Sequence, residues 1–376
     1  MQVKHLSNNY ISQIISNKIN YKMKNIKYVL TASIFLLFAM LFQPVSALAQ
    51  ISDIGKLIRA GKEDAETMAK AYLSPLSTGV GAGLNDGWTT SASAHKTLGF
   101  SIQIKGSLAF IPELDQSFDL SKLTLNKVHA ADPSETVSPT IGGADKVGPE
   151  IIVEDDGREV ARFNLPQGIG FHFVPAPMLQ ASVGLIKKTD VILRYVPKVK
   201  MGDFGNFQMK GIGLQHELTQ WLPAEAVFPV DISVMAAYSR TDLSAQLNIK
   251  PKEGAAPDPS YSGSYDNQQA AISFDTFTAK LIVGKDLPFI SIYGAAGYQT
   301  STMEAALTGD YPVPATVNGK TQTTTLSDPF GYKQTGNNKL SLTGGLKFKL
   351  AFFNIYGSYT LAKYPTANAG IGFSFR

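Results

Sequence analysis

Apolar and polar residues alternate along most of this chain, from residue 98 almost to its last residue. Near the end, for example, Leu340, Leu342 and Leu346 alternate with Ser341 and Thr343. Because successive side chains of a strand point to opposite faces, this period of two predicts strands with one apolar and one polar face. Ten such strands can be read from residue 98 onward, and a weaker segment at residues 88–95 would make eleven. The pattern fits a half-exposed sheet of a soluble protein as well as a barrel in lipid.

The connections between these strands separate the two possibilities. Working back from the C-terminus, short joints alternate with generally longer polar ones. The short joints lie near Phe352 and at residues 286–287, 222–229 and 187–188; the others lie at residues 364–365, 304–338, 248–269 and 202–205. Outer-membrane barrels have this asymmetry, with short periplasmic turns and longer outer loops. We therefore predict an all-β fold, a transmembrane antiparallel β-barrel.

The strand count is less direct. Single-chain bacterial barrels have an even number of strands, so eleven readable segments imply that at least one is missing. It would lie in residues 76–84 or 113–176, which gives about 12 strands, with 14 as the alternative.

The charge of the chain is divided unevenly. Lys and Arg number 34 and Asp and Glu 30, but residues 1–49 hold five lysines and no acid. The rest therefore carries 29 basic and 30 acidic residues, a net charge of −1. Nucleic-acid binding needs concentrated Lys and Arg, so we expect no nucleic-acid partner. The absence of cysteine excludes disulfides and thiolate metal sites.

The basic N-terminus has the pattern of a secretory signal. Lys24 and Lys27 precede the uncharged, largely apolar residues 28–42, and Ala47-Leu48-Ala49 has the small-x-small pattern of a cleavage site. We predict a signal peptide at residues 1–49, with Met23 as the alternative start and cleavage between Ala49 and Gln50. A membrane anchor is the other interpretation, but fifteen apolar residues followed by Gln43-Pro44 are too short to span with confidence.

Residues 50–90 are predicted to form an N-terminal helix and a Gly-rich segment. Apolar residues recur with helical spacing over Ile51–Tyr72, and Pro75 is expected to end the helix. Residues 77–88 lack GxGxxG spacing and predict a turn-rich connector rather than a phosphate loop. The barrel would then occupy residues 91–376, interrupted by a Pro- and Gly-rich insert at residues 113–176. That insert is either an ordered cap or plug, or hides a hairpin of Ile151–Val153 with Val160–Phe163.

If the apolar residues face lipid, the alternating polar residues face the lumen. The predicted lumen-facing residues are Lys105, Arg194, Lys198, Asp231, Thr276, Thr278, Lys280, Lys347 and Lys349. Basic rings would favour anionic permeants, whereas paired charges would simply fill the interior. The predicted interfacial tyrosines are Tyr195, Tyr238, Tyr298 and Tyr359.

No catalytic, cofactor or metal site is expected. The chain after the leader has four histidines but no HExxH or GxSxG motif. His216 and Glu217 are adjacent on a predicted strand and would point to opposite faces. The Asp155-Asp156-Gly157 turn lacks the spaced oxygen ligands of a known Ca²⁺ loop and is typical of a solvated hairpin.

The cleavable signal, the N-terminal helix, the Gly-rich connector and the aromatic last strand Gly370–Phe375 together carry a resemblance. The chain resembles uncharacterised Gram-negative outer-membrane barrels and, more distantly, FadL-type importers of hydrophobic compounds. It departs from them where Arg376 follows Phe375, and residues 72–76 lack their Asn-Pro-Ala signature.

The resemblance implies an outer-membrane location, recognition by the barrel-assembly machinery and contact with outer-membrane lipid. It also implies that residues 51–87 plug the lumen, and that small hydrophobic or amphipathic molecules are bound or pass by passive uptake. A structural or surface-interaction barrel using residues 248–269 and 304–338 is the alternative, and an outer-membrane hydrolase is the third.

Overall fold

The computed structural model describes residues 60–155, 157–200, 205–222, 229–251, 256–317 and 320–375. All of them belong to the second of two compact units, residues 46–376. The predicted signal peptide, its cleavage site at Ala49 and Gln50, and residues 51–59 of the predicted helix lie outside the described residues.

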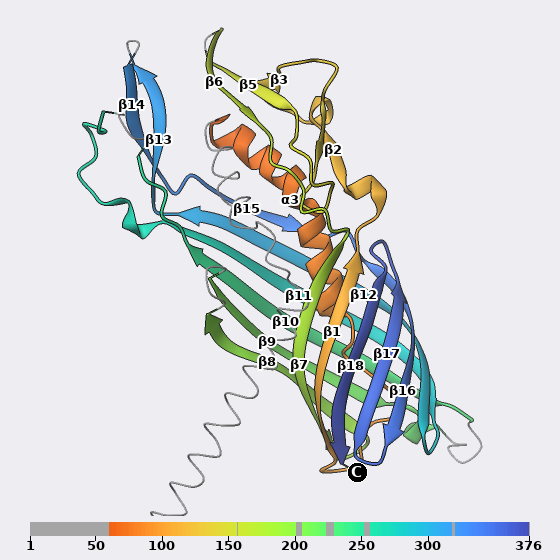
Figure 1. The fold of residues 1–376 in the computed structure, drawn as a ribbon. Coiled ribbons are helices and arrows are strands. Elements are labelled where there is room, and N and C mark those ends of the chain that lie inside the picture. The colour runs from red at the N-terminus through yellow and green to blue at the C-terminus, as the bar shows by residue number, and fades with distance from the viewer. Residues whose placement is uncertain are drawn as a thin grey trace, which may run out of the picture. The chain divides into compact units, whose positions relative to one another are not determined.

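Ten strands of the described chain pair in antiparallel fashion and close into a barrel (Figure 1). In the order of pairing they are β1 (Phe100–Phe110), β7 (Phe173–Leu185), β8 (Thr189–Lys200), β9 (Asn206–Glu217), β10 (Asp231–Gln246), β11 (Gln269–Asp286), β12 (Ile290–Thr308), β16 (Leu340–Leu350), β17 (Phe353–Leu361) and β18 (Thr366–Phe375). The last strand pairs with the first, from Phe100 with Phe375 to Ala109 with Thr366. An eleventh strand, β15 (Phe330–Thr335), pairs with one end of β12. The predicted all-β antiparallel barrel is confirmed.

The predicted count of 12 strands, with 14 as the alternative, is wrong. Residues 88–95 form no strand, residues 76–84 are helical, and the short strands of the 113–176 insert pair only with one another. The even-number rule leads to 12 strands only because residues 88–95 resemble a weak strand. The alternation from residue 98 onward correctly indicated ten strands.

Connections of the two kinds lie at opposite ends of the barrel. At the turn end, next to the C-terminus in Figure 1, residues 186–188, 218–230, 287–289 and 351–352 join the strands. At the loop end lie residues 111–172, 201–205, 247–268, 309–339 and 362–365. The predicted order of the connections is confirmed, but the turn-end joint at residues 218–230 is longer than the loop-end joints at residues 201–205 and 362–365.

The loop end carries additional small sheets and short helices. They are β2 (Ser117–Asp119) with β4 (Val137–Pro139), β3 (Val128–Ala130) with β5 (Glu150–Asp155) and β6 (Arg158–Asn164), β13 (Asp310–Val317) with β14 (Lys320–Ser327), and the 3₁₀ helices η2 (Glu113–Asp115), η3 (Leu120–Lys122) and η6 (Tyr265–Asn267); η5 (Thr219–Trp221) lies at the turn end. The predicted hairpin in the insert is confirmed, because Ile151 pairs with Phe163 and Val153 with Ala161.

The helix α3 (Lys62–Asn85) has 24 residues and includes Pro75. The predictions that Pro75 ends the helix and that residues 77–88 form a connector are therefore wrong. A proline inside a helix costs roughly 3 kcal/mol, so contacts with the wall must offset it. The hydroxyls of Tyr332 and Ser301 donate to the carbonyls of Ala69 and Ser77, on either side of the proline.

The glycines of α3 let the helix approach the wall. A Cβ atom on Gly81 would lie 2.1 Å from the Ser301 Oγ atom, and one on Gly83 would lie 2.8 Å from the Ala176 Cβ atom. Each glycine weakens an isolated helix by about 1 kcal/mol relative to alanine, and the close packing explains why they are helical here.

Among the described residues, no helix is both long enough and apolar enough to cross a membrane.

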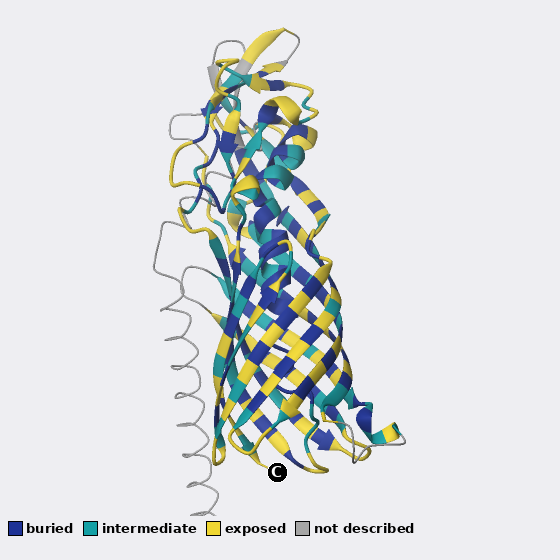
Figure 2. Cartoon of the chain, turned by 90° about the vertical axis from the view of Figure 1, so that its right-hand side faces the viewer, coloured by how far each residue is buried: buried dark blue, intermediate teal, exposed yellow. Residues whose placement is uncertain are grey.

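The wall changes its polarity along its length. Buried residues alternate with exposed or half-buried ones along most of the barrel wall (Figure 2). On β12 near the turn end, the outward Ile292 and Tyr298 are about half exposed, while the inward Ser291, Gln299 and Ser301 are buried. Towards the loop end the same strand buries Met303, Ala305 and Leu307 and turns Thr302 and Glu304 outward. The outer face of β10, which is separated from β12 by β11, also changes, from Val234 and Tyr238 to Arg240 and Asp242.

This reversal divides the wall into two zones. Near the turn end the outside is apolar and the inside buries charged and polar side chains among apolar ones, whereas a water-soluble protein turns its charged residues outward. Near the loop end the inside is apolar and packs around α3, while the outside carries ion pairs such as Arg240 with Asp275 and Lys333 with Glu304. We call these the inverted zone and the head; the head includes residues 111–172 and β13–β15.

Candidate functional site: the filled barrel interior

Residues 84–95 cross the interior of the inverted zone. From the end of α3 the chain runs without regular structure to His95, and the Leu98 amide donates to the Gly184 carbonyl at the turn end. Strand β1 begins two residues later. We call residues 84–95 the inner segment.

Arg194 of β8 binds the start of the inner segment. Its guanidinium donates to the Leu84 carbonyl at 2.6 Å and the Asp86 carbonyl at 2.7 Å, and to the Gln180 side chain at 3.0 Å. It also lies 3.8 Å from the centre of the Trp88 ring, which gives a cation–π contact. Arg194 is 1% exposed, so these contacts form away from water and replace its hydration.

Asp86 lies among three buried cations. Its Oδ1 atom is 3.6 Å from the Lys280 Nζ atom and accepts a hydrogen bond from Thr360. Lys105 donates to the neighbouring Gly87 carbonyl at 2.5 Å and lies 5.0 Å from the centre of the Tyr356 ring. Asp86 thus links strands β11 and β17 to the inner segment through its side chain, while Lys105 binds the backbone from β1.

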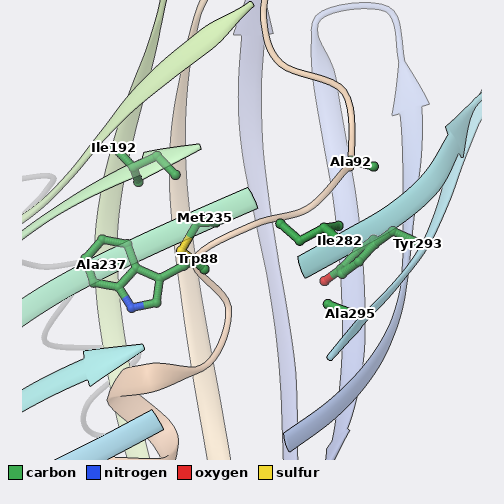
Figure 3. Packing of buried hydrophobic residues seen from close by; sticks show 8 residues of the cluster. All are labelled: Trp88, Ala92, Ile192, Met235, Ala237, Ile282, Tyr293 and Ala295. Atoms are coloured by element: carbon green, nitrogen blue, oxygen red, sulfur yellow. The ribbon is translucent and has the colours of Figure 1, made fainter. Parts of the chain in front are cut away.

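Apolar side chains fill the space between these polar contacts. Trp88 and Ala92 of the inner segment pack with buried residues of β8, β10, β11 and β12 (Figure 3). These residues are Ile192, Met235, Ala237, Ile282, Tyr293 and Ala295. Glycines of β9 make room for the indole, because a Cβ atom on Gly211 or Gly213 would lie about 3.0–3.1 Å from Trp88. The indole therefore packs directly against the backbone of β9.

Four carboxylates on adjacent strands hold the end of the inner segment. Ser91 and Ser93 donate to Asp286 and Asp231, each at 2.6 Å. The Ala94 amide donates to Glu217. Asp190 accepts hydrogen bonds from the backbone and the ring Nδ1 position of His95. Strands β8 to β11 thus each supply one anchor at the turn end.

The predicted lumen-facing residues occupy different levels of this interior. Lys105, Arg194, Lys280, Thr276 and Thr278 are buried in the wall, and Asp231 binds Ser93 at the turn end. Lys349 binds Asp286 at 2.8 Å, and Lys347 is partly buried on the same face of β16.

Lys198 is the exception, and its predicted position is wrong. Strand β8 contains a bulge between Val196 and Val199, after which Val199 pairs with the buried Phe207. An extra residue moves every following side chain to the other face. Lys198 is accordingly exposed on the face opposite to Val199.

The role of the inner segment as the partner of the lumen-facing residues is not predicted by the sequence. Asp86 and Trp88 lie in a stretch whose sequence predicts a connector and a weak strand. A signal was present, since charged and indole side chains in a Gly- and Ser-rich stretch need partners, but nothing in the sequence identifies those partners.

The histidines of the described chain have structural contacts. His216 accepts a hydrogen bond from the Trp221 indole on the outer face, while Glu217 is buried inside, so the two residues point to opposite faces. His95 binds Asp190 as described above. In the described ranges, no group of three or more metal-binding side chains comes together.

The four predicted interfacial tyrosines, Tyr195, Tyr238, Tyr298 and Tyr359, are about half exposed on the outer face. Tyr359 lines a shallow hollow of about 610 Å³, together with Leu281, Leu342 and small residues such as Gly294 and Gly344. This hollow lies on the apolar outer face of the inverted zone.

These features define a closed ten-stranded antiparallel β-barrel that is filled by its own N-terminal segment. The chain belongs to a family of unknown function, DUF6588, whose model matches residues 23–375. No curated protein matches the sequence.

Several solved outer-membrane structures match at low identity. Ail of Yersinia pestis is 11% identical over 74% of this chain and 100% of its own, with a TM-score of 0.24. Neisserial surface protein A is 9% identical over 73% and 95%, with a TM-score of 0.20. The translocator domain of the autotransporter NalP from Neisseria meningitidis is 10% identical over 83% and 97%, with a TM-score of 0.23. TM-scores of this size do not establish a shared strand arrangement, so the barrel assignment rests on the strand pairing. The resemblance to FadL-type importers stays a prediction.

Proposed function

We propose that this chain is an integral outer-membrane β-barrel of a Gram-negative bacterium that presents the head on the cell surface. The change of the outer face from apolar to polar and charged along β10 and β12 carries the proposal. An apolar outer face over a polar interior is stable in lipid, where transmembrane barrels show an apolar band about 25 Å tall. The charged outer face of the head suits water.

The ends of the barrel give its orientation. Outer-membrane barrels have short turns in the periplasm and longer loops outside, so the turn end faces the periplasm. The aromatic last strand, with Phe373 and Phe375 facing outward, suits both the inner interface and recognition by the barrel-assembly machinery. Export by a cleaved signal peptide remains part of the proposal.

The filled interior favours a surface-interaction role over an open pore. Arg194, Lys105 and Asp86 connect the inner segment to opposite sides of the wall. The head is ordered by its own sheets and by α3, so it offers a defined surface to partners outside the cell. This role requires no covalent chemistry and no cofactor.

Passive uptake of small hydrophobic or amphipathic molecules is the second candidate. The observation that favours it is the composition of α3, since Pro75 and the glycines Gly79, Gly81 and Gly83 make the helix dependent on wall contacts. Once released, this segment would lose its structure and could leave the lumen.

Two measurements test these proposals. Carbonate washing should leave the protein in the outer-membrane fraction, and unheated gel samples should migrate differently from boiled ones. Release by carbonate would contradict the membrane barrel. Uptake of a fluorescent long-chain fatty acid by cells separates the candidates: no uptake above vector controls, with wild type and with residues 62–95 deleted, would exclude the transport candidate.

A further inference from the structure

The contacts of residues 62–98 follow one another from the loop end to the turn end. Asp64 accepts hydrogen bonds from the amides of Asn126 and Lys127 in the head. Further along α3, the carbonyl of Ala69 accepts from Tyr332 of β15. The start of the helix is therefore fixed in the head.

The second half of the path continues through the inverted zone. Asn85 donates to the Thr300 carbonyl, near the level where β12 changes polarity. Arg194 then binds residues 84 and 86, and Asp190 binds His95 beside the turn at residues 186–188. The chain thus runs from the head to the turn end without reversing.

The segment is long enough for a complete crossing. The 24 residues of α3 rise about 36 Å at 1.5 Å per residue. Residues 86–95 add up to roughly 33 Å at 3.3 Å per residue. The summed length of the two segments exceeds the height of the apolar band, about 25 Å. The remaining length is available for the part of α3 that lies inside the head.

From this direction we infer that the barrel displays its own N-terminal segment on the cell surface. Lys62, exposed at the start of α3, lies outside the membrane, and Lys96, exposed at the other end of the crossing, lies in the periplasm. The described chain therefore begins in the head and crosses to the periplasmic end, and the barrel holds the start of α3 outside the membrane. The inference rests on the orientation proposed above.

The closing seam offers a route for assembly. Strand β1 follows the inner segment directly, and it pairs with β18, the last strand of the chain. The wall can therefore close only after the whole chain is available, around a segment that already lies inside. No folded element needs to pass through a finished pore.

The absence of cysteine makes the test direct. Single variants Lys62→Cys, Lys96→Cys and Glu135→Cys place one thiol at each end of the crossing and one in the exposed insert of the head. Intact cells are treated with a membrane-impermeant maleimide polymer, before and after permeabilisation of the outer membrane. Gel migration of unheated samples confirms that each variant folds.

We expect Lys62→Cys and Glu135→Cys to be labelled in intact cells, and Lys96→Cys only after permeabilisation. Labelling of Glu135→Cys with protection of Lys62→Cys would overturn the inference and leave the orientation standing. Labelling of Lys96→Cys with protection of Glu135→Cys would overturn both. A protease site inserted between Gly61 and Lys62 gives a second measurement, because external protease should cut it in intact cells.

Discussion

Arg194 connects the wall of the barrel to the chain inside it. Its guanidinium satisfies two carbonyls of the inner segment and covers one face of Trp88. Leaving a buried acceptor without a partner costs about 1–3 kcal/mol. Interior charges of this kind therefore contribute to stability through the hydrogen bonds that they make.

Arg194→Met should lower the free energy of unfolding by about 2–5 kcal/mol, because it leaves both carbonyls unpaired. The matched control is Arg240→Met in the exposed ion pair of the head, which should change it by less than about 1 kcal/mol. Urea titration of the protein in vesicles measures both. Trp88 emission should also shift to the red in a Trp221→Phe background; equal losses for the two arginines would contradict this account.

Gly81 tests how closely α3 approaches the wall. Gly81→Ala should destabilise the protein by about 1–3 kcal/mol despite the better helix propensity of alanine, because its Cβ atom would overlap Ser301. Gly344→Ala, with open space around it, should be within about 0.5 kcal/mol of wild type. Adding Ser301→Gly to Gly81→Ala should recover only part of the lost stability, because it removes the overlap but also the hydrogen bond from Ser301 to the Ser77 carbonyl. A stabilised Gly81→Ala variant would show that the helix lies farther from β12.

At the scale of elements, the sequence predicts strands well and the N-terminal helix poorly. Each strand has two faces in different environments, and the polarity of each residue indicates the face on which it lies. The continuation of α3 through Pro75 depends on contacts with Tyr332 and Ser301, which are far away in sequence. Lys198 was misplaced for a related reason, since a bulge leaves no mark in the alternation before it.

Strand β12 carries the boundary between lipid and water. Ala296→Arg introduces a charge on its outer face in the inverted zone. It should lower the free energy of unfolding in vesicles by about 2–4 kcal/mol. Thr302→Arg, six residues along the same face and in the head, should cost less than about 1 kcal/mol. Reversible unfolding of both variants from vesicles measures the difference. Equal costs would place the boundary elsewhere.

In the head, Asp258 fixes the loop at residues 256–261 to β14. It accepts hydrogen bonds from the side chain and amide of Ser260 and from the Thr325 amide, which lower the pKa of Asp258 to about 2. A lowered pKa stabilises the docked loop above the ordinary value near 3.9, and this contribution is lost as the pH falls towards 2.

Protease accessibility of this loop should therefore rise between pH 4 and pH 2, measured with pepsin in brief pulses. Asp258→Asn should be cut readily at pH 4 already. A wild-type loop with unchanged accessibility over this range would contradict the role of the carboxylate.

For the whole molecule, strand alternation and the order of connections were sufficient to predict a barrel with a turn end and a loop end. The count failed because residues 88–95 combine apolar and polar side chains without belonging to the wall. Several predicted lumen-facing residues do lie in the interior. Their contacts are with the inner segment of the same chain. Contacts between the wall and the inner segment form only in the closed fold, so a single sequence does not reveal them.

The central claim is a membrane barrel whose lumen is closed by residues 62–95. Conductance in planar lipid bilayers tests it most directly, with wild type compared with a variant lacking these residues. We predict that wild type inserts without steady conductance, and that the deletion variant, checked for its heat-dependent gel shift, conducts in discrete steps. Steady conductance of the wild type, or a folded deletion variant that does not conduct, would contradict it.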